Sequence, residues 1–207
     1  LNFLNKKTLD IYTNSILGIK TSKHLIENKR KIIGITSFGV TTIAVNLCVK
    51  LLKNKGYEAI VLPANGAGGR FFEKLINEKY FDGIIDLTTS EIADEVVGGT
   101  ASAGEKRLTS AVKMKIPQIV STGAIDMVNF SSLSSIPKKF AKRNLYQHTK
   151  FTTLMRTNKN ENIKVAKIMA KRLVNKKSKC AVIYPKKGFS DYDKKYKFFY
   201  GPKENES

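Results

Sequence analysis

The sequence predicts an α/β fold: a doubly wound (Rossmann-like), mostly parallel sheet with helices on both faces. Short apolar runs alternate with helical patterns from residue 31 to residue 193, the order that βαβ units produce. Several runs end in turns rich in Gly, Ser and Thr. Apolar residues make up 42% of the 207 residues, enough for a buried core. Ligands bind such sheets outside the carboxyl ends of the strands, so we expect these polar turns to share one edge.

Three regions are expected along the chain. Residues 1–30 have a loose helical pattern and are interpreted as a linker, or helical lead-in, from a missing first lobe. Residues 31–193 form the Rossmann-like lobe. Residues 194–207 form a truncated polar tail that ends without a closing helix.

The first half of the lobe is expected to contain three strands, at residues 31–36, 57–62 and 84–87. The helix after the first strand carries apolar residues on most sides, so it is predicted to be largely buried and to end at Gly56. Thr88 and Glu91 follow the third strand at the spacing of a capping box. The helix that they open is expected to end at Gly98.

The second half is expected to contain further strands and two helices. The expected strands are residues 118–120, 145–148 and 180–184, and the expected helices are residues 104–115 and 158–175. Residues 121–129 are interpreted as a polar turn that is too rich in small groups to be only a connector.

A glycine-rich turn opens the helix after the second strand. Backbone amides of Gly66, Gly68 and Gly69 would face an anion there, the helix N-terminus would add partial positive charge, and Arg70 would contact the same anion. The spacing matches neither the dinucleotide fingerprint nor the P-loop. A tight strand-to-helix turn without a ligand is the alternative interpretation.

The other polar turns supply further candidate ligand contacts. These binding candidates are Gly39, Thr41, Thr42, Thr88, Thr89, Ser121, Gly123 and Asn129. Candidate catalytic acids or bases are Glu91, Asp126 and His148. Each also has a structural explanation, because Thr and Glu cap helices and Asp and Asn form turns.

No metal site is expected. The chain has two histidines and no paired cysteine motif, whereas zinc needs three or four nitrogen or sulfur ligands. Acids around residues 86–95 are the kind of ligand that Mg²⁺ takes, but they also complement a helix N-terminus. Cys48 and Cys180 lie in apolar segments and are predicted to be buried thiols in a reducing, cytoplasmic compartment.

The formal net charge is +20, and the excess of lysine lies in residues 1–31, 138–150, 159–179 and 186–203. These segments lack aromatic residues that are spaced to stack bases, so no dedicated nucleic-acid binding is expected. No apolar run approaches the ~20 residues that span a membrane, so no membrane partner is expected either.

Six parts of the lobe resemble, in order, the signature segments of one family. They are ITSFGVTT, ANGAGGRFFE, DLTTSEIADEVVGG with SAGEKRL, PQIVSTGAIDMVNF, TLMRT and KKGFSDYD. They are similar to the tomato mosaic virus resistance protein-like family, commonly labelled an ATP-binding domain. The sequence departs from the family pattern within residues 65–69 and 121–124 and at Thr149, which leaves the exact ligand of those loops open.

The resemblance implies a particular organisation. The chain would be the second of two Rossmann-like lobes, with ATP as a candidate cofactor, Mg²⁺ as a candidate ion, and a first lobe that helps to bind the nucleotide. Apart from the resemblance, the truncated ends suggest an exposed apolar surface meant for a first lobe, a second protomer, or both, so a homodimer is expected for the full protein.

Three classes of function are therefore considered. The first is a ligand-binding lobe of a nucleotide-associated protein that binds a small anionic molecule. The second is an enzyme that acts on a small phosphorylated or carboxylated metabolite. The third is a non-catalytic interaction module, as the plant member of the family suggests.

Overall fold

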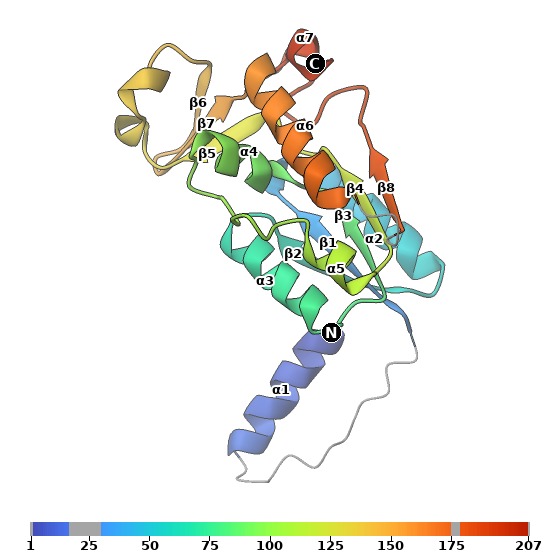
Figure 1. The fold of residues 1–207 in the computed structure, drawn as a ribbon. Coiled ribbons are helices and arrows are strands. Elements are labelled where there is room, and N and C mark those ends of the chain that lie inside the picture. Colours follow the sequence, from blue (N-terminus) through green and yellow to red (C-terminus); the bar gives the residue numbers. More distant parts are fainter. Residues whose placement is uncertain (1, 17–29, 175–178, 207) are drawn as a thin grey trace.

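The computed structural model describes residues 2–16, 30–174 and 179–206. A five-stranded parallel sheet runs through its centre in the order β2-β1-β3-β4-β8 (Figure 1). Its strands are β1 (Ile32–Ser37), β2 (Glu58–Pro63), β3 (Gly83–Asp86), β4 (Gln118–Ser121) and β8 (Cys180–Ile183). The predicted parallel sheet is confirmed.

The strand order reverses direction between β1 and β3. From β1 the chain crosses to β2 on one side, and all later strands of this sheet lie on the other side. Ligand sites of doubly wound sheets lie at the carboxyl ends of the strands beside this switch point. The topology therefore draws attention to the turns after β1, β3 and β4.

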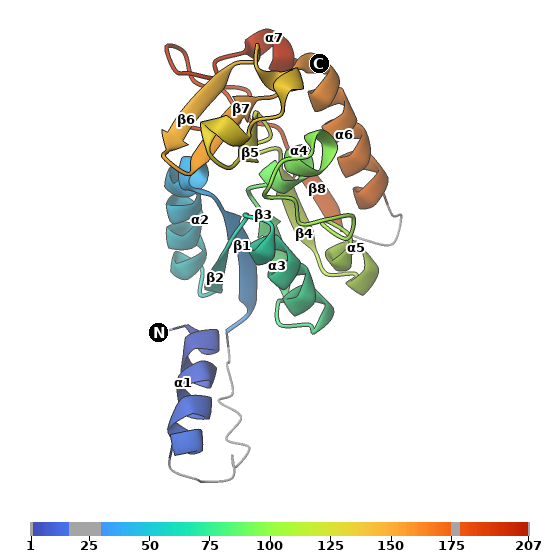
Figure 2. The ribbon, with the colours of Figure 1, turned by 90° about the vertical axis from the view of Figure 1, so that its left-hand side faces the viewer.

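Helices lie on both faces of the sheet, as predicted (Figures 1 and 2). The helix α2 covers one face, and α3, α4, α5 and α6 lie on the other. Their bounds are α2 (Thr42–Asn54), α3 (Ala67–Asn77), α4 (Ser90–Val97), α5 (Ser110–Met114) and α6 (Lys159–Leu173).

Two apolar clusters fill the second face. One joins α3 and α5 to the sheet through residues such as Phe72 and Ile84. The other joins α4 and α6 to the sheet through Ile92, Val120 and Met169. The apolar runs that predicted the strands thus supply the buried faces.

A second, antiparallel sheet was not predicted. It has the order β5-β7-β6, with β5 (Met127–Phe130), β6 (Leu145–Thr149) and β7 (Thr152–Arg156). The short strand expected at residues 145–148 is confirmed, but residues 127–130 form a strand rather than part of a polar turn. The sequence did not indicate this strand because Asn129 is polar. In the structure the side-chain amide of Asn129 donates a hydrogen bond to Asp94 of α4.

The helix predicted at residues 104–115 is much shorter than expected. Only α5 is helical, because Gly104 and Leu108 have φ angles of 81° and 68°, which a right-handed helix does not allow. The irregular segment between them places Arg107 in the protein interior.

Two expectations about burial were wrong. The helix α2 was predicted to be largely buried, but Ile43, Leu47 and Leu51 are exposed, and Ile43 and Leu47 face an open cavity instead of the core. Cys48 and Cys180 are free thiols but only half-buried, since one lies on α2 and the other on edge strand β8.

The C-terminus lies at one end of the molecule, and the N-terminus lies on the far side of the main sheet, where the first helix begins (Figures 1 and 2). The helix α1 (Phe3–Ile16) extends away from the sheet, and the rest of the predicted lead-in, residues 17–29, lies outside the described residues. The C-terminal segment buries Phe199 and forms the short helix α7 (Pro202–Asn205). Short 3-10 helices are η1 (Gly39–Thr41), η2 (Leu133–Ser135) and η3 (Lys138–Phe140).

Candidate functional site

The polar turns after β1, β3 and β4 meet at one edge of the sheet. The hydroxyls of Thr41 and Thr88 lie 2.8 Å apart, so the first and third turns are in contact. The Thr89 hydroxyl donates to the carbonyl of Ser121 and its amide donates to the carbonyl of Gly123, both at 2.9 Å. The expectation that these turns share one edge is confirmed.

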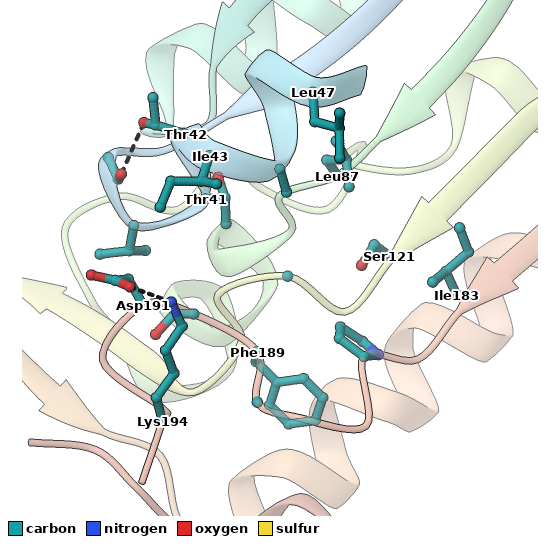
Figure 3. A pocket seen from close by; sticks show the side chains of 17 residues that line it. Thr41, Thr42, Ile43, Leu47, Leu87, Ser121, Ile183, Phe189, Asp191 and Lys194 are labelled. Atoms are coloured by element: carbon teal, nitrogen blue, oxygen red, sulfur yellow. Dashed lines mark hydrogen bonds and ion pairs between the residues drawn. The ribbon is translucent and has the colours of Figure 1, made fainter. Parts of the chain in front are cut away.

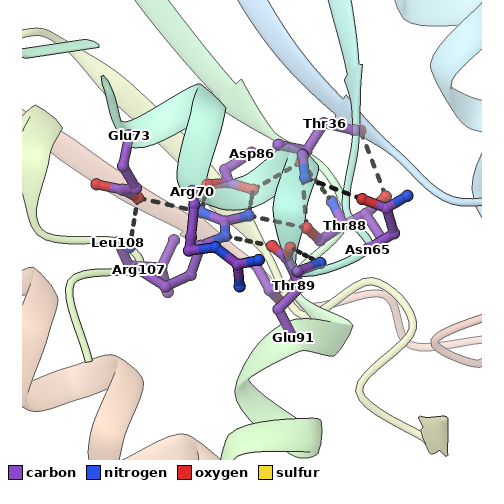
Figure 4. A network of polar contacts seen from close by, with 12 residues as sticks. Thr36, Asn65, Arg70, Glu73, Asp86, Thr88, Thr89, Glu91, Arg107 and Leu108 are labelled. Carbon is purple, nitrogen blue, oxygen red and sulfur yellow. Dashed lines mark hydrogen bonds and ion pairs between the residues drawn. The ribbon is translucent and has the colours of Figure 1, made fainter. Parts of the chain in front are cut away.

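Arg107 lies at the centre of a buried polar network below this edge (Figure 4). Its guanidinium is fully buried and donates to both carboxylate oxygens of Asp86, one of them at 2.6 Å. It also donates to Glu91 and, at 3.4 Å, to Glu73. One cation thus holds carboxylates from β3, α4 and α3 together.

The charges of this network depend on each other. Burial alone would lower the pKa of Arg107, but the carboxylates of Asp86, Glu91 and Glu73 outweigh burial and hold that pKa well above its usual value. Burial raises the pKa of Glu91, whereas Arg107 and the Gly66 amide lower it. The network is enclosed, which makes it a structural support for the sheet edge.

The predicted capping box does not form. No side chain caps the start of α4. The carboxylate of Glu91 instead accepts a 2.6 Å hydrogen bond from the amide of Gly66, in the glycine turn before α3. A Cβ at Gly69 would collide with this carboxylate, which explains glycine at that position. Glu91 thus supplies a protein carboxylate beside the N-terminus of α3.

The remaining residues of the glycine turn have protein partners too. The amide of Gly68 donates to Asn65 at 2.9 Å, and exposed Arg70 donates to the carbonyl of Ser102 at 3.0 Å. The hypothesis that a ligand anion contacts Gly66, Gly68, Gly69 and Arg70 stays a prediction.

A cavity of about 410 Å³ opens at the same sheet edge, between α2 and the turn after β8 (Figure 3). Five of the predicted binding residues line it: Gly39, Thr41, Thr42, Ser121 and Gly123. The wall is mostly apolar and includes Ile43, Leu47, Ile183 and Phe189. A cavity of this size, apolar with a few polar groups, is typical of a small-molecule site.

The far wall of the cavity comes from the turn after β8, which the candidate residues did not include. Ser190, Asp191 and Lys194 lie there, and Lys194 forms an ion pair with Asp191. The hydrogen bond from Lys194 lowers the pKa of Asp191, so this carboxylate is charged at neutral pH. The segment KKGFSDYD was the sequence signal for this wall.

Asp126 lies behind the cavity wall and is fully buried. It accepts a 2.6 Å hydrogen bond from the hydroxyl of Ser190, and among the described residues its other oxygen has no hydrogen-bond partner. Burial raises the pKa of Asp126 to about 7, although the Ser190 hydrogen bond and the charge of Arg156 oppose that rise. This acid therefore changes protonation near neutral pH.

The other candidates lie elsewhere. Asn129 binds Asp94, whose pKa burial raises to about 6, and joins α4 to β5. His148 is exposed on β6 with its ring nitrogen 3.0 Å from the Tyr192 hydroxyl. Neither lines the cavity.

Two further properties bear on the site. Within the part of the chain that the structure describes, no three His, Cys, Asp or Glu side chains are grouped as a metal site would require. In that same part, no helix has the length and apolar character needed to cross a membrane.

These features define a doubly wound α/β lobe with a mostly apolar cavity at its switch-point edge. The chain belongs to the family described as "Uncharacterised protein family (UPF0261) C-terminal domain", which matches residues 30–207. The resemblance seen in the sequence is thereby confirmed at the level of the family.

Relatives come from bacteria and plants. A UPF0261 protein of Clostridium tetani is 43% identical over 208 residues, covering 100% of this chain and 52% of the relative. A tomato (Solanum lycopersicum) protein named "ToMV resistance protein Tm-1(GCR237)" is 39% identical over 193 residues, covering 92% of this chain and 26% of the relative. The chain spans about half the length of the bacterial protein and a quarter of the tomato protein.

Proposed function

We propose that this chain is the ligand-binding C-terminal lobe of a nucleotide-associated protein, and that it binds a small anionic molecule in the cavity between α2 and the turn after β8. The observation that carries the proposal is the cavity itself, at the switch-point edge of a doubly wound sheet.

The polar groups of the cavity suit an anion. Thr41 is the N-cap residue of α2 and Thr42 is its first residue, and the N-terminus of a helix carries partial positive charge. The ammonium group of Lys194, which is paired with Asp191, lies on the opposite wall. We therefore place the anionic group of the ligand between Thr42 and Lys194.

The apolar groups suit the rest of the ligand. Ile43, Leu47 and Phe189 offer a surface for a flat or apolar body such as a nucleobase. ATP is accordingly the first ligand to test, with Mg²⁺ carried by its phosphates and Asp191 as the carboxylate beside them. Other segments of the longer relatives would complete the site if ATP binds weakly to this lobe.

The test is calorimetric titration of the chain with ATP, ADP and a sugar phosphate, with and without Mg²⁺. Ala44 is an exposed cavity residue, so Ala44→Trp should fill the cavity and abolish binding without damaging the fold. Lys50→Trp, on the same helix but outside the cavity, is the matched control and should bind normally.

Charge variants locate the anion. Loss of the Lys194 charge in Lys194→Gln should weaken binding about tenfold, the usual effect of losing a charge-assisted hydrogen bond. If Arg70→Ala weakened binding about tenfold and Lys194→Gln did not weaken it, the anion would instead lie at the glycine turn. Absence of binding by all three ligands would refute the proposal for the isolated lobe.

The Asp126–Ser190 pair favours a second candidate function, an enzyme acting on a phosphorylated or carboxylated metabolite. Ser190 lines the cavity, and Asp126, which accepts its hydrogen bond, has a pKa of about 7, suited to proton transfer near neutral pH. Mass spectrometry of a metabolite mixture incubated with the chain would detect turnover, which Asp126→Asn should abolish. Glu91 is less suited, because Arg107 and Gly66 engage its carboxylate.

A further inference from the structure

Aromatic side chains from two distant segments form one cluster beside the small sheet. Tyr146 of β6 stacks on Phe198 of the C-terminal segment, with ring centres 4.1 Å apart and an angle of 22° between the rings. Tyr192 packs edge-on against both rings and contacts His148. The fold therefore brings rings together that are some fifty residues apart in the sequence.

Two rings of this region are largely exposed to solvent. Tyr196 is 89% exposed and Phe198 is 55% exposed. Tyr196 also has a φ of 70°, a left-handed conformation that is rare for a bulky residue. An exposed tyrosine held in this conformation adds little to the core, so a role in binding explains it better than a role in folding.

Positive charge surrounds these rings. Lys195 and Lys197 are exposed on either side of Tyr196, and exposed Lys150 follows His148 in the β6–β7 hairpin. The nearest acids of the segment are already engaged: Asp191 pairs with Lys194, and Asp193 is buried against Arg156. We call this region, made of His148, Lys150, Lys195, Tyr196, Lys197 and Phe198, the aromatic–lysine surface.

We propose that the aromatic–lysine surface binds single-stranded nucleic acid. Single strands are held by cations that contact phosphates and by aromatic rings on which bases stack, with little preference for sequence. Phe198, the half-exposed ring of the Tyr146–Phe198 stack, and exposed Tyr196 offer faces to bases, and the Lys195 ammonium lies 5.0 Å from the centre of the Tyr196 ring. This inference goes beyond the proposed ligand site, which lies in the cavity at the sheet edge.

The inference differs from the expectation that the sequence suggested. Within each basic segment taken alone, the sequence shows no spacing of aromatic residues that indicates base stacking. The cluster of rings forms only because Tyr146 and His148 of β6 lie beside Tyr192 and Phe198 in the folded chain. Stacking positions that arise from tertiary contacts are not visible as a spacing in the sequence.

The experiment measures binding of a short fluorescent oligouridine RNA, and of the matching oligothymidine DNA, by anisotropy over a range of salt concentrations. Asparagine tolerates the left-handed backbone of this position. Tyr196→Asn should therefore remove one stacking ring without straining the chain, and should weaken binding about tenfold. Phe71→Ala, at an exposed ring of α3, is the matched control and should leave binding unchanged.

Charge variants distinguish this surface from general basicity. Lys195→Gln with Lys197→Gln should weaken binding and reduce the slope of log affinity against log salt by about 1.4, roughly 0.7 for each lost phosphate contact. The control removes two exposed lysines of α6, Lys167→Gln with Lys171→Gln, and should change both quantities much less.

Three results would overturn the proposal. Equal losses in the α6 control and the surface variant would show that binding is only non-specific charge attraction. Unchanged binding in Tyr196→Asn, with its fold verified by circular dichroism, would show that this ring does not stack. Binding to anionic lipid vesicles but to neither oligonucleotide would assign the surface to membranes instead.

Discussion

The guanidinium of Arg107 forms ion pairs with buried carboxylates of three elements. They are Asp86 of β3, Glu91 of α4 and Glu73 of α3. Removing the guanidinium would leave buried carboxylates without a counter-charge, which typically costs about 3–5 kcal/mol. We therefore expect Arg107→Met to lower the free energy of unfolding by about that amount, measured by urea denaturation.

The neighbouring residue provides the control for this prediction. Lys106 is exposed, so Lys106→Met should change the free energy of unfolding by no more than about 0.5 kcal/mol. Similar stability of the two variants would contradict the structural role assigned to Arg107.

Asp126 gives a prediction about pH. Its folded-state pKa is raised to about 7 from an ordinary 3.8, so between these values the folded chain binds more protons than the unfolded chain. Stability contributed by this group is present at low pH and is lost as pH rises toward 7, with a slope approaching ~1.4 kcal/mol per pH unit.

The comparison that tests this is urea denaturation of the native chain and of Asp126→Asn between pH 4.5 and pH 7.5. The stability difference between them should shift in favour of the variant as pH rises through this window, because asparagine does not ionise. A difference that stays constant with pH would show that Asp126 keeps an ordinary pKa.

At the scale of elements, the contact between α3 and α4 depends on the absence of a side chain at Gly69. A Cβ there would collide with the Glu91 carboxylate, which is fixed by Arg107 and the Gly66 amide. Gly69→Ala should therefore destabilise the chain by about 1–3 kcal/mol, the usual cost of overpacking.

Gly39→Ala is the matched variant, since no atom lies within 4 Å of the position where its Cβ would be. Its midpoint of urea denaturation should stay close to that of the native chain, whereas Gly69→Ala should unfold at distinctly lower urea. Equal midpoints would mean that the glycine turn can move away from Glu91.

The elements also show what the sequence could predict. The strands of the parallel sheet were predictable because their apolar runs are buried and their turns carry Gly, Ser and Thr. The strand β5 was not, because Asn129 in its middle is satisfied only by a distant carboxylate, Asp94. The left-handed backbone at Leu108 left no local signal either.

The candidate site was predictable on one side only. Thr41, Thr42 and Ser121 were found because polar turns after parallel strands share an edge. Lys194 and Ser190 were not, because their approach to α2 depends on β8 pairing with β4 far along the chain. Arg107 was one basic residue among acids, and its burial could not be read from composition.

At the scale of the whole molecule, no described helix covers the β3, β4 and β8 part of the sheet face on which α2 lies. Neighbouring strands place Ile85, Ile119 and Ala181 side by side on the face opposite α4 and α6, where a hollow of about 430 Å³ lies. Leu47 and Leu51 of α2, one helical turn apart, are exposed as well. Contiguous exposed apolar surface of this kind marks an interface in many proteins.

We expect a second copy of the chain to cover this face, as the homodimer predicted for the full protein requires. Charged residues at its centre would have to be desolvated on pairing, so Leu51→Lys with Ile119→Lys should give a monomer in sedimentation velocity at micromolar concentration. Leu133→Lys changes an equally exposed leucine in η2, away from the face, and should leave the dimer intact. A native chain and full-length protein that both sediment as monomers would refute the pairing. A dimer that persists in the double variant would place the interface on another surface of the molecule.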